Sequence, residues 1–434
     1  MYNYFRAAYY LTCLLRHTHW KRERLLNHQN KKIREIVRYA FDNVPFYHEK
    51  FLQLGIKPED VKTVEDLNKL PIIRREELQH NNEKLISKQF DVQELKVVST
   101  SGSTGKPLFT YLSGREDAFR KAKLLRPHIV CGQKMRDKWV VIGPPWQSGE
   151  VTRLQKFLDF YVPISVSVFD DAVTQAQNIE KLKPDVVDGY SNSLVLMAKE
   201  MEKKGMKTIT PKFIMGGAEL IDMPSRKFLE EVFSAPFYDQ YASEELQMVA
   251  WQCPEKLGYH VDADSVIMQV VDEEGEEASL GEKGEIVCTS LFNYAMPFIR
   301  YALGDVGVAA EESGCLCGIT FPLMEVIEGR KDSVVVLPDG RKVPALVFGW
   351  IMEFYKFYRN IYQYRIVQSK VDFLRVLIKR KSDDVKEGVM EAELLRHMRK
   401  MLGISGSEVT IEIGFVKEIP RDRSGKLRKV ISEV

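Results

Sequence analysis

Short β-rich stretches alternate with helical segments between residues 139 and 245, and this alternation constrains the fold more than any other feature. The β-rich stretches read KWVVIGPPW, ISVSVF, PDVVDGY, KFIMGGAE and PFYDQYASEE. Helix-patterned segments of about 10 to 15 residues separate them, which is typical of βαβ units. We therefore expect a parallel sheet with helices on its faces.

The residues on either side follow other patterns. Residues 21–90 carry apolar and charged residues at helical spacing. From about residue 258, strands and acidic, glycine-containing turns predict hairpins. A chain of 434 residues also exceeds what one core usually supports. We predict a large N-terminal α/β body with parallel sheets and a β-rich subdomain (1–331), followed by a small α+β C-terminal lid (332–434).

The charge balance gives no support for nucleic-acid binding as the main task, and we expect no nucleic-acid partner. The 63 basic and 61 acidic residues leave a net charge of only +2. No apolar run approaches the roughly 20 residues that span a bilayer, so no transmembrane segment is expected. Six unevenly spread cysteines indicate a reducing cytoplasm rather than a disulfide framework. We expect a cytoplasmic protein, either a monomer or a homodimer.

The N-terminal segment MYNYFRAAYYLTCLLRHTHWKRERLL is predicted to form an amphipathic helix. Its aromatic and leucine face has two possible partners, a membrane surface or the body of the protein. We favour packing on the body.

A loop rich in serine, threonine and glycine interrupts the segment VVSTSGSTGKPLFTYLSG, residues 97–114. Flanking valine, threonine and phenylalanine favour strands, so a hairpin-like loop is expected. Such a loop can bring backbone N–H groups, hydroxyls and an ammonium close to a polyphosphate. Pro107 follows the lysine, which rules out the kinase-type P-loop pattern. The alternative is a plain surface hairpin. The candidate residues are Ser101, Gly102, Ser103, Thr104, Gly105 and Lys106.

Five further segments carry residues suited to binding a nucleotide. MGGAE (215–219) and YASEE (241–245) each follow a predicted strand, where an open parallel sheet presents its ligand crevice. RYALGD (300–305) supplies a carboxylate after a glycine turn. GRKD (329–332) lies at the expected domain joint, and the basic tail PRDRSGKLRK (420–429) carries Lys426.

In this order and at these separations, the motifs resemble those of the adenylate-forming superfamily of acyl-CoA synthetases, and more narrowly its phenylacetate–CoA ligase and CapK-like branch. The likeness runs from about residue 30 to the C-terminus. TSGSTGKP is similar to the phosphate loop of the family, GGAE to its adenine-side segment, and YASEE to its Tyr-Gly-x-Ser/Thr-Glu motif. IRYALGD, GRKD and PRDRSGKLRKV are similar to its Arg-Tyr-Arg-Thr-Gly-Asp, hinge and C-terminal lysine motifs.

The resemblance implies that ATP activates a carboxylic acid as an acyl-adenylate, and that protein charges and hydrogen bonds stabilise the phosphoryl transfer. Ser101, Ser103, Thr104 and Lys106 would hold the outer phosphates. Glu245 would ligate magnesium, Asp305 would bind the ribose hydroxyls, and Arg330 would contact ribose or phosphate. Lys426 would reach the α-phosphate and the carboxylate during adenylation. The remaining nucleotide-binding candidates are Gly217, Ala218, Glu219, Asp239, Gln240 and Tyr241.

A second half-reaction is also implied, in which a nucleophile, usually the thiol of coenzyme A, expels AMP. The small mobile domain would then swing about Asp332 and remove Lys426. The alternative for Asp332 is an ordinary turn residue before a strand.

Two motifs depart from the family pattern. Ala242 replaces the glycine of the Tyr-Gly motif, and Glu244 replaces its Ser/Thr. The extra carboxylate leaves open which glutamate meets magnesium. Ala302 and Leu303 replace an Arg-Thr pair, which removes a cation near the ribose. These changes weaken the case for a standard thioester ligase more than the case for nucleotide binding.

Four residues form a candidate zinc set: Cys253, His260, Cys315 and Cys317. A Cys3His set is a common closed zinc site, although the spacings are not those of the usual zinc fingers. Similar ligand pairs flank the same motifs in CapK-like relatives. The alternative is free thiols and a surface histidine in two loops. Cys13, Cys131 and Cys288 have no partner pattern and are expected in the core.

The acyl pocket is expected between the segments GPPW, GYSNS and GGAE. Trp146, Tyr190 and Tyr241 either line it or are core aromatics. An aromatic or small organic acid fits the phenylacetate-type resemblance, and a sugar acid or amino-acid carboxylate fits the CapK-like one.

We therefore expect an ATP-dependent, AMP-forming ligase that uses magnesium and transfers an acyl group to an acceptor, foremost coenzyme A. One alternative is transfer to an amine or hydroxyl. Another is a relative that binds nucleotide without turnover.

Overall fold

The computed structural model describes residues 2–99, 108–145, 151, 153–206, 209–309, 314–330, 334–406, 408–422 and 425–434. The chain divides into two compact units. The first unit comprises Met1–Gly132 and Tyr238–Ile327, and the second comprises Gln133–Phe237 and Glu328–Val434. Asp332 lies outside the described residues, so the domain boundary between 331 and 332 stays a prediction.

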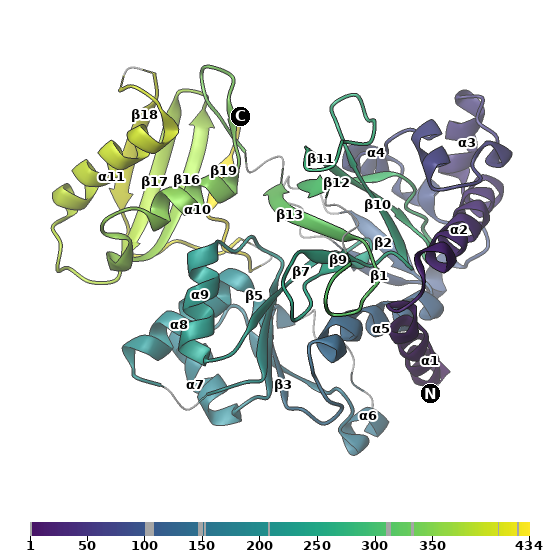
Figure 1. The fold of residues 1–434 in the computed structure, drawn as a ribbon, viewed down its shortest axis with the longest axis horizontal. Helices are drawn as coiled ribbons and strands as arrows, with labels where there is room; N and C mark the ends of the chain where they lie inside the picture. The colour runs from purple at the N-terminus through teal and green to yellow at the C-terminus, as the bar shows by residue number, and fades with distance from the viewer. Residues whose placement is uncertain are drawn as a thin grey trace. The chain divides into compact units, whose positions relative to one another are not determined.

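The first unit combines N-terminal helices with an antiparallel sheet (Figure 1). Its helices are α1 (Tyr2–His17), α2 (Arg22–Asn43), α3 (Pro45–Gln53), α4 (Arg75–His80) and α5 (Gly114–Val130). Its strands are β1 (Lys96–Ser99), β2 (Phe109–Leu112), β7 (Phe237–Ser243), β8 (Gln247–Trp251), β9 (Tyr259–Val261), β10 (Val266–Val271), β11 (Lys283–Ser290), β12 (Tyr301–Ala309) and β13 (Leu323–Arg330).

Helix α2 shows how the core of this unit forms. Ile33, Ile36, Val37 and Ala40 recur at helical spacing and are fully buried. They belong to one hydrophobic cluster with sheet residues such as Trp251. The strands of the sheet follow the order β10-β11-β12-β13-β9-β8-β7, and the hairpins expected after residue 258 are present as β10, β11 and β12.

Two sequence predictions about local structure in this unit are confirmed. Strands β1 and β2 pair antiparallel, with Ser99 opposite Phe109, so they form the hairpin expected around the serine-rich loop. The loop itself lies outside the described residues. Helix α1 packs against α5, where the ring of Tyr10 meets Phe119 at 5.2 Å between centroids. The N-terminal helix therefore packs on the protein's own body, although Phe5 and Tyr9 stay exposed.

The second unit begins with the predicted alternation of strands and helices. Its elements up to Phe237 are β3 (Trp139–Gly143), α6 (Arg153–Leu158), β4 (Pro163–Ser167), α7 (Ala172–Leu182), β5 (Val186–Tyr190), α8 (Ser191–Lys203), β6 (Phe213–Gly217) and α9 (Met223–Phe233). The strands follow the order β6-β5-β3-β4, and each described neighbouring pair is parallel. Figure 1 shows α7, α8 and α9 packed together beside these strands. The expected α/β fold class is confirmed.

The C-terminal part of the second unit is a small α+β layer. Its elements are β14 (Val335–Val336), β15 (Lys342–Val343), α10 (Ala345–Glu353), β16 (Ile361–Lys370), β17 (Phe373–Arg380), α11 (Glu387–Leu402), β18 (Thr410–Phe415) and β19 (Val430–Ser432). The strands follow the order β18-β17-β16-β19. Met390, Leu394 and Met398 of α11 are fully buried and belong to the core of this layer.

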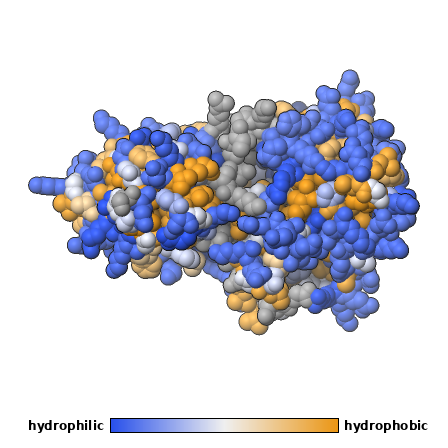
Figure 2. Space-filling model, turned by 90° about the horizontal axis from the view of Figure 1, so that it is seen from above, coloured by the Kyte–Doolittle hydropathy of each residue, from blue (hydrophilic) through white to orange (hydrophobic). Residues whose placement is uncertain are grey.

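One face of the molecule is mostly polar (Figure 2). Figure 2 shows one face, on which hydrophilic side chains cover most of the area and hydrophobic ones form smaller patches. Within the described part of the chain, no helix has both the length and the apolar character that a membrane crossing requires.

Candidate nucleotide and metal sites

Glu245, the predicted magnesium ligand, follows β7 and is 4% exposed. The hydroxyl of Tyr301 on β12 donates a 3.0 Å hydrogen bond to its Oε1, and Nη1 of Arg75 on α4 lies 3.4 Å from the same oxygen. A carboxylate is the hard oxygen donor that magnesium prefers. These contacts hold that donor in one orientation.

Asp305, the predicted ribose ligand, lies on β12 beside Tyr241 of β7. The Tyr241 hydroxyl donates a 2.7 Å hydrogen bond to Oδ2 of Asp305. Burial, together with the negative charge of Asp305, raises the pKa of Tyr241 well above its ordinary value. The phenol therefore stays protonated and remains a donor that orients the carboxylate.

Two neighbouring candidates on β7 are engaged with other residues of the same unit. The hydroxyl of Tyr259 donates a 2.7 Å hydrogen bond to Oδ2 of Asp239, which is buried. The side-chain amide of Gln240 lies 3.4 Å from Nε2 of His128. Both side chains help to fix β7 in the sheet.

In the second unit, the GGAE segment contacts the basic tail. Glu219 follows β6, and its carboxylate accepts hydrogen bonds from the backbone N–H groups of Leu427 and Asn192. The Asn192 amide in turn donates a 2.9 Å hydrogen bond to the Leu427 carbonyl. Burial raises the pKa of Glu219, while these hydrogen bonds and the charge of Lys426 oppose the shift. The structure thus brings Glu219 and the Lys426 segment together at the carboxyl end of β6.

The backbone at GGAE is unusual, because Ala218 has a φ of 64°, which L-residues rarely adopt. Such conformations cost free energy and cluster at functional sites. Gly217 ends β6 immediately before it. The preceding Gly216 packs on Phe237, where an added Cβ would lie 2.4 Å from the ring.

A tight turn presents Lys426. The backbone N–H of Lys426 donates a 2.9 Å hydrogen bond to Oδ1 of Asp422, and the N–H of Asp422 donates one to the Lys426 carbonyl. Gly425 has a φ of 86°, and an added Cβ would lie 2.5 Å from Val168. Nη1 of Arg421 donates a 2.6 Å hydrogen bond to the Ser193 hydroxyl. The lysine therefore lies on a defined turn against α8.

Two lysines join the C-terminal strands to α8 and α9. The ammonium of Lys429 is 2.6 Å from Oδ2 of Asp222, the N-cap residue of α9. Lys199 of α8 donates hydrogen bonds to the carbonyls of Ile361 and Tyr362, at 3.1 and 2.6 Å. Burial and then the charge of Lys429 lower the pKa of Lys199 to about 7.

The remaining candidates differ in how much of each residue the structure describes. Tyr190 ends β5 and is 7% exposed within the hydrophobic cluster of the parallel strands. Arg330 ends β13, but only its backbone is described. The candidates outside the described residues are Ser101, Gly102, Ser103, Thr104, Gly105, Lys106, Trp146 and Asp332.

The replacements at Ala302 and Leu303 suit the packing of the first unit. Ala302 is 5% exposed and packs with Val271 and Val287. Leu303 packs against the main hydrophobic cluster. Apolar residues stand here because their surroundings are apolar.

The predicted zinc ligands come together in the first unit. The donor atoms of Cys253, His260, Cys315 and Cys317 all lie within 4.8 Å of one another. The sulfurs of Cys253 and Cys315 are 3.6 Å apart, and Sγ of Cys317 is 3.3 Å from Nε2 of His260. Zinc–sulfur bonds of about 2.3 Å in a tetrahedron require sulfurs about 3.8 Å apart. The spacing of the cluster therefore fits a zinc ion.

The surroundings of His260 also fit metal binding. Its Nδ1 lies 3.3 Å from the Phe321 carbonyl, so Nδ1 can carry the proton and leave Nε2 as the ligand atom. Burial lowers the pKa of His260, which favours the neutral ring that binds metals.

Sequence reasoning missed several residues that hold these sites. Tyr301 lay within the quoted motif RYALGD, and Lys429 lay within the quoted basic tail. Arg75 and Asn192 had no motif signal. Asp222 carried only a helix-start signal, because aspartate before proline and serine is typical of an N-cap.

Comparison with known proteins agrees with the motifs. Residues 337–433 match the family of the CapK C-terminal domain. Phenylacetate-coenzyme A ligase of Thermus thermophilus is 24% identical over 94% of this chain and 97% of the relative's length. Protein CapK of Staphylococcus aureus is 22% identical over 94% of this chain and 89% of the relative's length. The predicted resemblance is confirmed.

A solved structure decides the fold. The crystal structure of 2-hydroxyisobutyryl-CoA ligase in the postadenylation state, in complex with R3-HIB-AMP, superposes with a TM-score of 0.78. It is 18% identical to this chain, and the match covers 93% of this chain and 88% of the ligase. The chain has the fold of the adenylate-forming ligases. This fold explains why the GGAE segment and the basic tail, far apart in sequence, meet at the end of β6.

Proposed function

We propose that the protein is an ATP-dependent, AMP-forming ligase that activates a carboxylic acid and transfers the acyl group to coenzyme A. The observation that carries the proposal is the contact between Glu219 and the backbone of Leu427. It joins two motifs that adenylate formation requires, and it holds the residue next to Lys426 at the carboxyl end of a parallel strand. Open parallel sheets bind ligands at this end.

In the first half-reaction, a carboxylate oxygen of the acid attacks the α-phosphorus of ATP, and the bond to pyrophosphate breaks. Negative charge builds on the oxygens in transfer, and Lys426 supplies a cation to stabilise it. Asp305, oriented by Tyr241, binds the ribose hydroxyls. Glu245 offers its carboxylate to magnesium, which neutralises phosphate charge when it is bound.

In the second half-reaction, the thiolate of coenzyme A attacks the acyl carbon, and AMP leaves with the electron pair of the broken bond. Phenylacetate-coenzyme A ligases are similar to this chain over most of its length, and this similarity supports coenzyme A as the acceptor. We also propose that the C-terminal domain moves about Asp332 between the two half-reactions.

A structural zinc ion bound by the Cys3His set of the first unit completes the proposal. Distances near those of a tetrahedral site and the His260–Phe321 contact support it. The ion would join the loops around β9 and β13. None of the six cysteines is in a disulfide, which suits a reducing compartment such as the cytoplasm.

The match of residues 337–433 to the CapK C-terminal domain supports a second candidate, transfer to an amine or hydroxyl. Pyrophosphate exchange into ATP, measured with a panel of aromatic, hydroxy, sugar and amino acids, tests adenylation without an acceptor. Product analysis with coenzyme A or with amines then separates the two acceptors. ATP binding without exchange for any acid would overturn both candidates in favour of a non-catalytic nucleotide-binding protein.

A further inference from the structure

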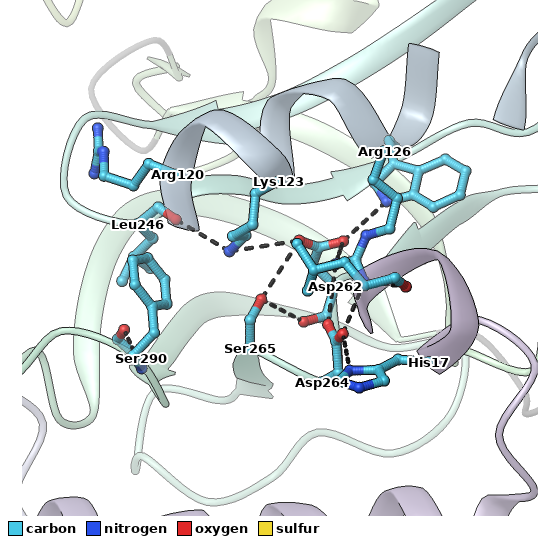
Figure 3. Close-up of polar contacts among 12 residues, drawn as sticks. His17, Arg120, Lys123, Arg126, Leu246, Asp262, Asp264, Ser265 and Ser290 are labelled. Atoms are coloured by element: carbon cyan, nitrogen blue, oxygen red, sulfur yellow. Dashed lines mark hydrogen bonds and ion pairs between the residues drawn. The ribbon is translucent and has the colours of Figure 1, made fainter. Parts of the chain in front are cut away.

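Three cations extend from α5 into the interior of the first unit: Arg120, Lys123 and Arg126 (Figure 3). Arg120 is 6% exposed, and the other two are fully buried. Burying a cation is costly unless it is paired or hydrogen-bonded. Each cation must therefore have partners that repay its burial.

The partners of the first two cations are consecutive backbone carbonyls. Nη1 of Arg120 donates hydrogen bonds to the carbonyls of Glu244 and Glu245, at 2.8 and 3.3 Å. Nζ of Lys123 donates a 3.2 Å hydrogen bond to the Leu246 carbonyl. These carbonyls form the turn between β7 and β8, and this turn carries the Glu245 carboxylate.

Acidic residues hold the C-terminal half of α5. Oδ2 of Asp262 is 3.4 Å from Nζ of Lys123, and Arg126 bonds both carboxylate oxygens of Asp264 at 2.8 and 2.9 Å. Nδ1 of His17 lies 2.9 Å from Asp264. Figure 3 shows Lys123 between Leu246 and Asp262. Helix α5, whose side chains bind the turn carbonyls, is therefore also fixed by these buried ion pairs.

Arg120 also accounts for Glu244, the residue that departs from the family motif. Nη2 of Arg120 lies 3.8 Å from Oε2 of Glu244, whose side chain is 35% exposed. Without that cation, the charge of Glu244 would add to the charge of Glu245, the carboxylate beside Arg75, near a magnesium–phosphate group. With it, the charge of Glu244 is balanced within the protein.

We propose that Arg120 and Lys123 are positioning residues for Glu245, and that Arg120 also neutralises Glu244, so that Glu245 rather than Glu244 is the carboxylate that the turn offers to magnesium–ATP. The inference rests on the proposed function, because it assigns the turn to magnesium–ATP. It extends that function to residues outside every motif.

The first experiment compares Arg120→Gln and Lys123→Met with Lys121→Gln. Lys121 is a matched control, because it lies on the same helix and pairs with Asp117 rather than with the turn. We expect the magnesium concentration for half-maximal pyrophosphate exchange to rise about tenfold in the first two variants, as is typical when support of a metal ligand is lost. Lys121→Gln should leave it unchanged. A fall in melting temperature with unchanged magnesium dependence would reduce the two cations to structural residues and overturn the inference.

The second experiment separates the two roles of Arg120. In Arg120→Gln/Glu244→Gln, we expect about threefold recovery of the magnesium dependence, because the unbalanced carboxylate is gone while the carbonyl contacts stay lost. No recovery would overturn the neutralising role. The thermal shift produced by magnesium–ATP in the wild type is the reference: its absence refutes the proposed function, whereas equal shifts in wild type and variants refute only this inference.

Discussion

The ammonium of Lys429 lies 2.6 Å from the carboxylate of Asp222, and this ion pair fastens the C-terminal tail to the start of α9. Only 5% of the Asp222 side chain is exposed. Although burial raises the pKa of Asp222, the charge of Lys429 lowers it below its ordinary value. The pair is therefore present above the ordinary pKa of aspartate and is lost as the pH falls through the lowered one.

Breaking this pair should impair adenylation more than acyl transfer. In Lys429→Met, Asp222 keeps a buried, unpaired charge, and the turn that carries Lys426 loses its fastening. We expect pyrophosphate exchange to fall about tenfold, because small displacements of catalytic groups have effects of this size. Release of AMP from supplied acyl-adenylate should change little. Asp222→Asn in the same chain should restore part of the exchange, and exposed Lys400→Met serves as the control. Equal losses in both half-reactions would contradict a role specific to adenylation.

Lys199 predicts a pH dependence of stability. Its pKa is lowered to about 7 by burial, so between about pH 7 and 10 the unfolded chain binds a proton there that the folded chain does not. Stability attributable to this residue should therefore rise with pH across that window. We expect Lys199→Met to remove this rise, measured as the difference in melting temperature between pH 7 and pH 9.5. The same slope in wild type and variant would assign it to other groups.

Lys426 should matter for one half-reaction only. Under the proposed function, replacing it with glutamine removes the cation that stabilises the charge developing during adenylation, and losses of about 100- to 1000-fold are typical of such groups. Exchange should fall by this amount, while thioester formation from supplied acyl-adenylate stays within a few fold. Exposed Lys417→Gln is the matched control. If Lys426→Gln kept wild-type exchange, the tail lysine would have no part in the chemistry.

The Cys3His set should bind one zinc ion per chain, measurable by metal analysis of the purified protein. Removal by a chelator, or Cys317→Ser, should lower the melting temperature by about 10 °C, because a structural metal contributes its binding energy to folding. Cys13→Ser changes a cysteine of α1 that is not one of the four grouped residues, so this variant should retain the metal. If the protein contained no metal and its melting temperature did not change, the four side chains would not form a zinc site.

The parallel sheet could be predicted because its signal is local. Each strand of KWVVIGPPW, PDVVDGY and KFIMGGAE is a short apolar run bounded by turn residues, and a helix follows most of them. The zinc set could be predicted as a group of residue types, but its geometry depends on β9 and β13 pairing as neighbours.

The supports of the candidate sites could not be predicted in the same way. Glu219 accepts hydrogen bonds from backbone N–H groups, which every residue except proline has and which carry no sequence signal. The Asp222–Lys429 pair joins residues far apart in the chain, so it exists only once α9 and the tail pack together. Arg120 lies on a helix full of charged residues, and only the fold distinguishes it from its exposed neighbours.

The contact of Gly425 with Val168 limits how the C-terminal part can be exchanged between related proteins. A side chain at 425 would meet both an unfavourable φ and the Val168 methyl groups. A chimera that joins the rest of this chain to the C-terminal tail of a relative therefore needs glycine at position 425. A tail taken from a relative with a different residue at position 168 should pack poorly. A hybrid that takes the tail without the segment around Val168 should fold, but its Lys426 should not reach the position that it has in this protein.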